Sequence, residues 1–235
     1  MSLFFRRLRF ILALILVILI TAYGLSRLGY YEWPREYDPL VLPDLDAASN
    51  FLTPFKLKRT DSSAENCRAA FARAGKAVAI EPERTEGSQC IKQDTIKLAS
   101  LSAAKLQVEE TRCAIAARLF MWEHNVVQPA ARKYFKEPVT ELLHFGSYSC
   151  RNIRGSSATS EHATANAFDI SGFRLRSGKL ITLKQQWQGS QPPANFLREV
   201  RDGACDYFNV VLSPDYNADH HDHLHVDMGW YQTCR

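Results

Sequence analysis

The apolar residues of this chain form one long uncharged run near the start and short periodic segments afterwards. The run covers residues 10–26 and contains no charged side chain. At about 1.5 Å of rise per helical residue, it would span about 25 Å, enough to cross a thin bilayer. Arg6, Arg7 and Arg9 precede the run, so the positive-inside rule places the N-terminus in the cytoplasm and the later chain outside it. Residues 1–27 are therefore predicted to be a single-pass transmembrane anchor.

A cleaved signal peptide is the alternative interpretation of this segment. Ala22-Tyr23-Gly24 offers a weak small-x-small cleavage site. The apolar run is longer than the usual hydrophobic core of a signal peptide, which favours the retained anchor. Under either interpretation the rest of the chain lies outside the cytoplasm.

Residues 28–60 are predicted to be an extended tether between the anchor and a folded domain. Tyr30, Tyr31 and Trp33 lie where an aromatic belt would meet the outer membrane interface. Prolines recur through the segment and disfavour helix. The folded domain is therefore expected over residues 61–235.

Within residues 61–235 the hydrophobic period changes from helical to strand-like. A capping pattern at Asp61–Glu65 predicts a short helix through Arg73, and apolar residues at three- and four-residue steps predict a helix over residues 107–127. Later segments alternate or form short apolar runs, which are typical of strands. The expected strands lie in residues 142–153, 163–175, 179–184 and 208–212, with a helix at 194–204. Helices first and a strand meander afterwards predict an α+β fold in which helices pack on an antiparallel β-sheet.

The charge distribution argues against nucleic acid as a partner. The net charge of +4 comes entirely from Arg6, Arg7, Arg9 and Arg27, because residues 1–27 hold no acidic residue. Removing those four from the 29 basic residues leaves 25, which balance the 25 acidic residues. Binding to phosphates requires a basic face, and a neutral exported domain does not predict one.

The cysteines fit an exported domain. All six lie after the anchor and none forms a CxxC pair, which disfavours a thiolate zinc site or a thioredoxin motif. An even number of scattered cysteines in an oxidising compartment predicts up to three disulfides. Six cysteines allow about fifteen pairings, and the spacing does not choose among them.

Candidate chemistry is concentrated near the C-terminus. Four of the seven histidines lie within residues 220–225, and apolar residues alternate with His223, His225 and Asp227 as in a strand. Residues i and i+2 of a strand share a face, so His223 and His225 are expected to point the same way. His162 and Asp169 are a plausible second half of the site. Two imidazoles and a carboxylate suit a catalytic zinc ion with one open position.

The zinc hypothesis assigns His162, Asp169 and His225 as metal ligands. A base is then needed beside the metal-bound water, and His223 and Asp222 are both candidates. The sequence leaves the choice between them open.

Two resemblances extend this interpretation. The pattern Ser160-x-His162-x-x-Ala165-x-Ala167-x-Asp169, with His223-x-His225, resembles the SxHxxGxAxD and HxH motifs of the zinc peptidase superfamily that includes lysostaphin, D-Ala-D-Ala carboxypeptidases and the hedgehog signalling domain. Residues 113–227 resemble the bacterial extensin-like C-terminal domain family more closely. The matching pieces include Gly146-Ser-Tyr-Ser-Cys-Arg151, Ser160-Glu-His-Ala163 and Phe168-Asp-Ile170. Ala165 departs from the pattern, since glycine is common there.

The resemblance implies the same zinc ligands and gives further residues their roles. His223 would assist catalysis, Asp222 would be the base of carboxypeptidase-like members, and Arg151 would stabilise the oxyanion, with Arg154 as second choice. It implies a zinc-dependent peptidase that hydrolyses an amide bond in the peptide stem or cross-bridge of peptidoglycan. The enzyme would be anchored in the inner membrane, with its catalytic domain in the periplasm.

Two other functional classes remain as alternatives. A non-catalytic module would keep the zinc scaffold and use it to bind cell wall or a protein partner, as the hedgehog domain shows is feasible. A metal-free structural domain would rely on its disulfides alone. Zinc content and turnover distinguish these classes from a peptidase.

Overall fold

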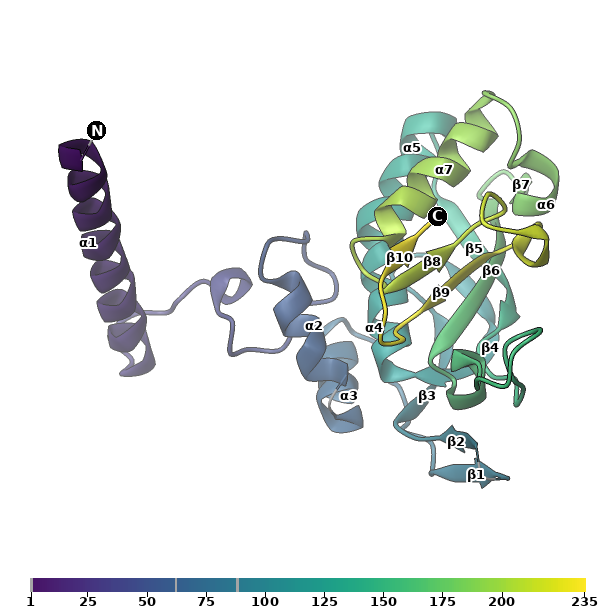
Figure 1. Cartoon of the computed structure of the whole chain (residues 1–235), viewed down its shortest axis with the longest axis horizontal. Coiled ribbons are helices and arrows are strands. Elements are labelled where there is room, and N and C mark those ends of the chain that lie inside the picture. Colours follow the sequence, from purple (N-terminus) through teal and green to yellow (C-terminus); the bar gives the residue numbers. More distant parts are fainter. Residues whose placement is uncertain (1, 62, 88) are drawn as a thin grey trace. The chain divides into compact units, whose positions relative to one another are not determined.

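The computed structural model describes residues 2–61, 63–87 and 89–235, and the chain divides into two compact units (Figure 1). The first unit ends at Val41 and the second covers Leu42–Arg235. The second unit contains every candidate site residue.

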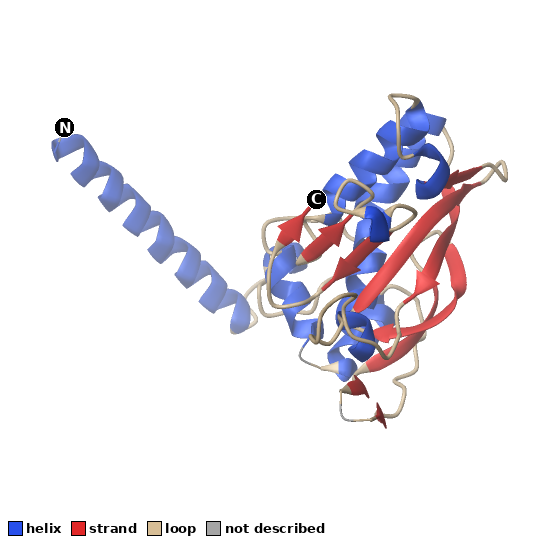
Figure 2. Ribbon diagram, turned by 45° about the vertical axis from the view of Figure 1, so that its right-hand side comes forward, coloured by secondary structure: helices blue, strands red, loops and turns tan. Residues whose placement is uncertain are grey.

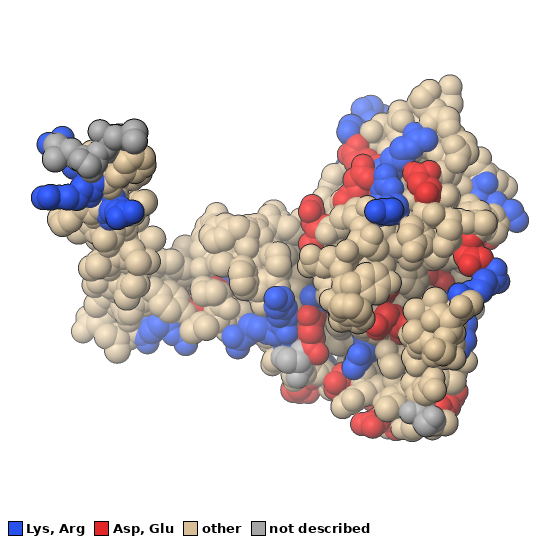
Figure 3. Space-filling model, viewed as in Figure 1, with Lys and Arg blue, Asp and Glu red and all other residues tan. Residues whose placement is uncertain are grey.

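The first unit is built around the apolar helix α1, Ser2–Arg27. Its portion Phe4–Arg27 is long and apolar enough to cross a membrane, a property that membrane anchors and signal sequences share. Figure 3 shows basic side chains at the two ends of this helix and tan side chains between them. After the short turn η1, Arg35–Tyr37, Asp38 accepts a hydrogen bond from the Tyr23 hydroxyl at 3.0 Å and lies 3.5 Å from the Arg27 guanidinium.

The second unit is an α+β domain. Its helical segments are α2 (Thr53–Asp61), α3 (Ala64–Arg73), α4 (Cys113–Trp122), the π-helical segment η2 (Glu123–Val127), α5 (Gln128–Phe135), η3 (Glu161–Thr164), α6 (Leu183–Gln186), α7 (Pro192–Ala204) and η4 (Ala218–His220). Its strands are β1 (Arg84–Glu86), β2 (Cys90–Lys92), β3 (Thr95–Ser100), β4 (Lys105–Arg112), β5 (Val139–Gly146), β6 (Ala167–Leu175), β7 (Leu180–Thr182), β8 (Val210–Leu212), β9 (Leu224–Asp227) and β10 (Thr233–Cys234).

The main sheet is mixed, which corrects the expected antiparallel sheet. Its strand order is β10-β8-β9-β6-β5-β4-β3, with β7 paired to β6. The pairs β4–β5 and β10–β8 are parallel, whereas the other pairs are antiparallel. The chain passes through α4, η2 and α5 between β4 and β5, and such a crossover returns it in the same direction. Figure 2 shows these helices and α7 on one side of the strands.

The hydrophobic core lies between the sheet and the helices. The indole of Trp122 packs against Phe173 at 6.2 Å between ring centroids, and Phe173 packs against Phe196 at 5.2 Å. All three side chains are buried. These contacts pack α4 and α7 against β6.

The helix expected over residues 107–127 begins later than predicted. Residues up to Arg112 form β4, which pairs with β3 on one side and β5 on the other, and the helix starts at Cys113. The pairing of β4 with β3 and β5 outweighs the helical preference that the spacing of Val108 and the later apolar residues suggests. At the other end, Pro129 does not stop the helix, because it occupies the first turn of α5 after η2.

The expected extended tether also differs from the structure. Residues from Leu42 onward belong to the second unit, and α2 occupies the last part of the predicted tether with Pro54 in its first turn. Leu45 and Leu57 are fully buried. Asp61 at the end of α2 pairs with the buried Arg118 of α4 through two contacts of 2.5 and 2.8 Å. Proline is compatible with the first helical turn, so the proline pattern did not exclude a helix here.

Other predicted elements are confirmed. The short helix α3 begins after Ser63, whose hydroxyl accepts the N–H of Asn66 at 3.3 Å. The strands β6, β7 and β8 lie within their expected ranges, and the helix α7 begins two residues before its expected start at residue 194. All six cysteines are paired, as Cys67–Cys113, Cys90–Cys150 and Cys205–Cys234.

The buried Glu123 ties the helical layer to the turn between β3 and β4. Its carboxylate accepts backbone N–H groups of Ser102 and Ala104, each at 3.1 Å, and the Ser102 hydroxyl at 2.5 Å. The side-chain amide of Gln128 donates to the same carboxylate at 2.5 Å. A fully buried carboxylate is tolerated only when its oxygens are satisfied in this way.

We expect Glu123→Ala to lower the free energy of unfolding by about 3 kcal/mol, because it leaves several buried donors without an acceptor. The measurement is urea unfolding of the full chain in detergent micelles. Glu83→Ala, at an exposed glutamate, is the control and should change stability by less than about 0.5 kcal/mol. Equal effects of the two substitutions would contradict this role for Glu123.

Candidate functional site

Two adjacent strands place Asp169 opposite His225. β6 and β9 pair antiparallel with these residues in register, and the register partners Ile170 and Leu224 follow directly. Ile170 and Leu224 point into the hydrophobic core. Because side chains alternate across a strand, Asp169 and His225 lie on the face of the sheet away from the helices. The buried apolar positions thus fix which face carries the polar pair.

His162 reaches the same place from a short turn before β6. The Ser160 hydroxyl accepts the N–H of His162 at 3.3 Å and begins η3. The turn ends at Ala165, which has φ of 53° in the left-handed region. This is the position where the resembling motif often has glycine, a residue that adopts this conformation without steric cost. The tight turn lets His162 reach back to Asp169.

The three side chains converge on one point. His162 Nε2 is 3.2 Å from Asp169 Oδ2, His225 Nδ1 is 3.0 Å from Asp169 Oδ1, and the two ring nitrogens are 3.1 Å apart. One ligand atom from each residue lies within 4.8 Å of the others. His162 is buried, and Asp169 and His225 keep only 14% and 12% of their side-chain surface exposed.

The far nitrogen of each histidine is held by an oxygen acceptor. His162 Nδ1–H donates to the backbone carbonyl of Ser147 at 2.7 Å, and His225 Nε2–H donates to Asp227 Oδ2 at 2.9 Å. The other oxygen of Asp227 accepts the N–H of Gly229 at 2.7 Å. In the neutral tautomers that these bonds select, the lone pairs of His162 Nε2 and His225 Nδ1 face Asp169. Such outer acceptors commonly fix the orientation of metal-ligating histidines.

This donor set fits a zinc ion. Two neutral imidazole nitrogens and one carboxylate match the three protein ligands of catalytic zinc sites, which leave a further position for water or substrate. The predicted ligands His162, Asp169 and His225 are the group that the structure brings together. The partial exposure of Asp169 and His225 leaves the cluster open on one side.

His223 and Asp222 form a pair at the edge of this cluster. His223 Nδ1–H donates to Asp222 Oδ1 at 3.0 Å, which leaves Nε2 directed toward Asp169 Oδ1 at 3.6 Å. β9 begins only at Leu224, so Asp222 is free of the strand alternation and sits behind His223. The ring of Phe145, which is 62% exposed, packs edge-on against His223 at 5.7 Å. The two candidate bases are therefore hydrogen-bonded to each other, and only His223 faces Asp169.

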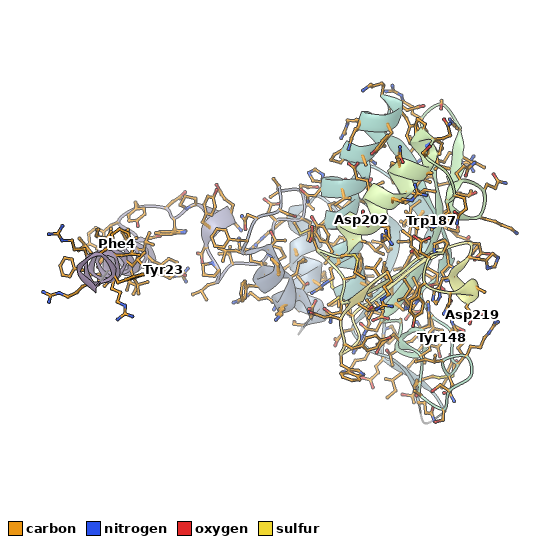
Figure 4. All side chains as sticks on the ribbon, turned by 45° about the horizontal axis from the view of Figure 1, so that its top comes forward. Phe4, Tyr23, Tyr148, Trp187, Asp202 and Asp219 are labelled. Atoms are coloured by element: carbon orange, nitrogen blue, oxygen red, sulfur yellow. A yellow bond between two sulfur atoms is a disulfide. The ribbon has the colours of Figure 1, made fainter. Side chains whose placement is uncertain are left out.

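The two candidate arginines lie on the exposed loop after β5. Arg151 lines a surface hollow with Glu86 and Gln89, and its guanidinium contacts the backbone oxygen of Asn152 at 3.5 Å. Among the described contacts, none joins Arg151 to the histidine–aspartate cluster. Arg154 instead pairs at 2.5 Å with an aspartate of η4, Asp219, which Figure 4 labels.

Sequence reasoning gave little weight to two contributors. Ser147 offers a backbone carbonyl to His162, a role that carries no residue-type signal. His220 is not among the predicted site residues, yet its ring centroid lies 5.2 Å from His223 and 5.8 Å from His225. The density of histidines in residues 220–225 was the available signal for its participation.

One family model covers the part of the chain that contains these residues. A family model described as "Extensin-like protein C-terminus" matches residues 65–235. The chain belongs to this family. The match runs from the first turn of α3 to the C-terminus, so it contains the whole sheet and every candidate site residue. No curated protein and no solved structure matches the chain.

The ionisable groups of the extensin-like domain are strongly coupled at the cluster. Burial alone would raise the pKa of Asp169, but hydrogen bonds from His162 and His225 outweigh burial and hold that pKa well below its ordinary value. Burial likewise disfavours the charged form of His225, yet Asp169 and Asp227 raise the pKa of His225 to about 9. Burial is the largest reason that the pKa of His220 falls to about 4.

We expect the chelator-treated chain to lose stability as pH rises from about 6.5 to about 9. Folded His225 keeps its proton up to about pH 9, whereas an unfolded histidine releases it near 6.5, so the stabilisation is present below that window and lost across it. The limiting slope is about 1.4 kcal/mol per pH unit. The measurement is thermal unfolding of the full chain in micelles against pH. Asp169→Asn should flatten the dependence, and an unchanged slope would contradict the coupling.

Proposed function

We propose that this protein is a zinc-dependent peptidase that hydrolyses an amide bond in the peptide stem or cross-bridge of peptidoglycan. The observation that carries the proposal is the convergence of His162 Nε2, Asp169 and His225 Nδ1, with the opposite nitrogen of each histidine held by an oxygen acceptor. In the metal-free chain a proton on His225 stabilises the cluster. In their neutral tautomers the two fixed rings direct lone pairs at one place, which a metal cation can occupy instead of that proton.

The proposed ligands are His162, Asp169 and His225. A bound zinc ion would lower the pKa of a water molecule and polarise the substrate carbonyl. Ser147 and Asp227 hold the two imidazoles in the tautomers that this requires. The sheet register keeps Asp169 opposite His225, so two of the three proposed ligands lie on paired strands, and His162 is held by the turn η3.

His223 is the proposed proton acceptor and donor. Its Nδ1–H is fixed by Asp222, so its Nε2 carries the lone pair beside Asp169. A carboxylate behind an imidazole also stabilises the imidazolium that forms when Nε2 takes a proton. The open choice between Asp222 and His223 becomes a division of labour in which His223 transfers protons and Asp222 positions it.

The substrate class rests on the motif resemblance and on cellular placement. The spacing of His162, Asp169 and His225 resembles the superfamily of lysostaphin and D-Ala-D-Ala carboxypeptidases, which act on peptidoglycan peptides. The membrane-length helix α1 and the three disulfides suit an anchored domain in an oxidising compartment, the periplasm. An anchor would confine a lytic enzyme to the membrane face of the cell wall.

A non-catalytic zinc module that binds cell wall or a protein partner is the second candidate. One observation favours it: the Arg151 guanidinium contacts Asn152, and Arg154 pairs with Asp219. The oxyanion role that the resemblance assigns to an arginine would therefore need one of these side chains to change partner when substrate binds. A binding module needs no such rearrangement.

We expect the full chain in micelles to hold one tightly bound zinc ion, and His162→Ala to lose it, because the substitution removes a buried ligand. Elemental analysis measures the metal, and mass spectrometry of digested peptidoglycan fragments identifies the bond cut. His221→Ala is the matched control, because His221 is exposed and donates to the Ala218 carbonyl.

The outcomes separate the candidate functions. Zinc with new stem-peptide products only from wild type and the control supports the peptidase. Zinc without products supports the binding module. Absence of zinc contradicts both and leaves a disulfide-bonded structural domain.

Substitution of the two positioning carboxylates should have different effects on zinc binding and on catalysis. Asp227→Asn is expected to weaken zinc binding by about 10- to 100-fold, because it loosens the orientation of His225. Asp222→Asn should leave zinc binding intact but lower kcat by about 100-fold or more, because His223 loses the partner of its imidazolium. Competition with a chelating dye measures affinity, and peptide cleavage measures kcat. Equal loss of zinc from both variants would contradict the division of roles.

A further inference from the structure

Four histidines at the cluster each have one ring nitrogen held by an oxygen. In His162, His223 and His225 the other nitrogen faces the cluster. His220 Nδ1 lies 2.7 Å from Asn217 Oδ1, and when Nδ1 donates this bond, Nε2 keeps its lone pair. The proposed zinc uses His162 and His225. His220 and His223 therefore form a second pair of oriented imidazoles.

The second pair is compact and adjoins the first. The rings of His220 and His223 are 5.2 Å apart between centroids, and His223 Nε2 is 3.6 Å from Asp169 Oδ1. Asp169 Oδ1 is also 3.0 Å from His225 Nδ1, so the same carboxylate faces both pairs. Sites for two ions commonly share such a carboxylate, with the ions about 3.5–4 Å apart.

The loop that carries His220 is held in place from both sides. Arg154 pairs with Asp219 beside it, and the Trp187 indole N–H donates to Asp215 Oδ1 at 2.8 Å. Arg201 donates to the Ser213 hydroxyl at 3.2 Å at the start of the loop. Pre-organised ligands lose less conformational freedom on binding an ion.

We propose that His220 and His223, with Asp169, form a second and weaker site for a transition-metal cation such as Zn²⁺. Imidazole nitrogens and a carboxylate oxygen are the donors that such ions prefer, whereas Mg²⁺ and Ca²⁺ prefer oxygen alone. The neighbouring His221 is exposed, its Nδ1–H donates to the Ala218 carbonyl, and its Nε2 lies 3.6 Å from Asp222 Oδ2, so both of its nitrogens have other partners. It does not belong to the second site.

The second site has a consequence for activity that rests on the proposed function. An ion on His223 Nε2 occupies the lone pair that would accept a proton, so the second cation inhibits the reaction that the first one supports. Activity should therefore rise up to one equivalent of zinc and fall as excess zinc fills the second site. The domain would have low peptidase activity where the concentration of free zinc is high.

The test is isothermal titration of Zn²⁺ into the metal-stripped full chain in detergent micelles. Wild type is expected to show two binding events. His220→Gln should weaken the second by at least about tenfold and leave the first unchanged, while His221→Gln should change neither. His223→Gln is a further variant that should also weaken only the second event. Thermal unfolding checks that each variant is folded.

A single event in wild type, or equal weakening by His220→Gln and His221→Gln, would overturn the second site. Cleavage of stem peptides is then measured for wild type and His220→Gln at one equivalent and in excess zinc. Inhibition by excess zinc in wild type, relieved in His220→Gln, supports the inhibitory role. Two events without cleavage at any zinc concentration would leave the second site standing and contradict the peptidase. Cleavage that excess zinc inhibits equally in both chains would contradict the inhibitory role of the second site alone.

Discussion

The antiparallel register of β6 and β9 is the constraint on which the site depends. It sets Asp169 opposite His225 and, by the same alternation, sends Ile170 and Leu224 into the core. A shift of one residue would bury a carboxylate and an imidazole and expose two large apolar side chains. The cost of that exchange fixes the register, so the apolar core determines where the polar cluster lies. Only His162 depends on a turn.

That turn and its supports explain how a crowded cluster is maintained. Ala165 adopts a left-handed conformation that is unfavourable for a residue with a Cβ, and its carbonyl accepts the Arg112 backbone N–H at 3.0 Å. The fully buried Ser147 accepts from His162 through its carbonyl and donates through its hydroxyl to the Ala167 carbonyl at 2.7 Å. Local strain of this kind persists only where the surroundings hold it, and it is common at functional sites.

The sequence predicted the site residues better than their surroundings. Residue type and strand alternation singled out His162, Asp169 and His225, the three side chains that the structure brings together. The direction of the strands was harder to predict. β4 and β5 are parallel through a helical crossover, but residues 107–112 of β4 were expected to belong to the helix that follows them. Residues 105–112 contain apolar spacing that suits either element, and only pairing with β3 and β5 decides between them. The direction of the Arg151 side chain was equally hard to predict from the sequence, because contacts distant along the chain determine where a loop side chain points.

The division between His223 and Asp222 follows from where β9 begins. Had the strand started at Asp222, alternation would have placed this carboxylate on the core face, and His223 would have lacked a partner for its Nδ1. The strand begins at Leu224, so the preceding backbone is free to bring Asp222 behind His223. The same freedom lets η4 fold His220 against His223 and His225. A short strand thus supplies one ligand, His225, while the segment before it supplies the imidazoles of His220 and His223 at the open edge of the cluster. That arrangement suits proton transfer, which needs an imidazole near the ligands but not bound among them.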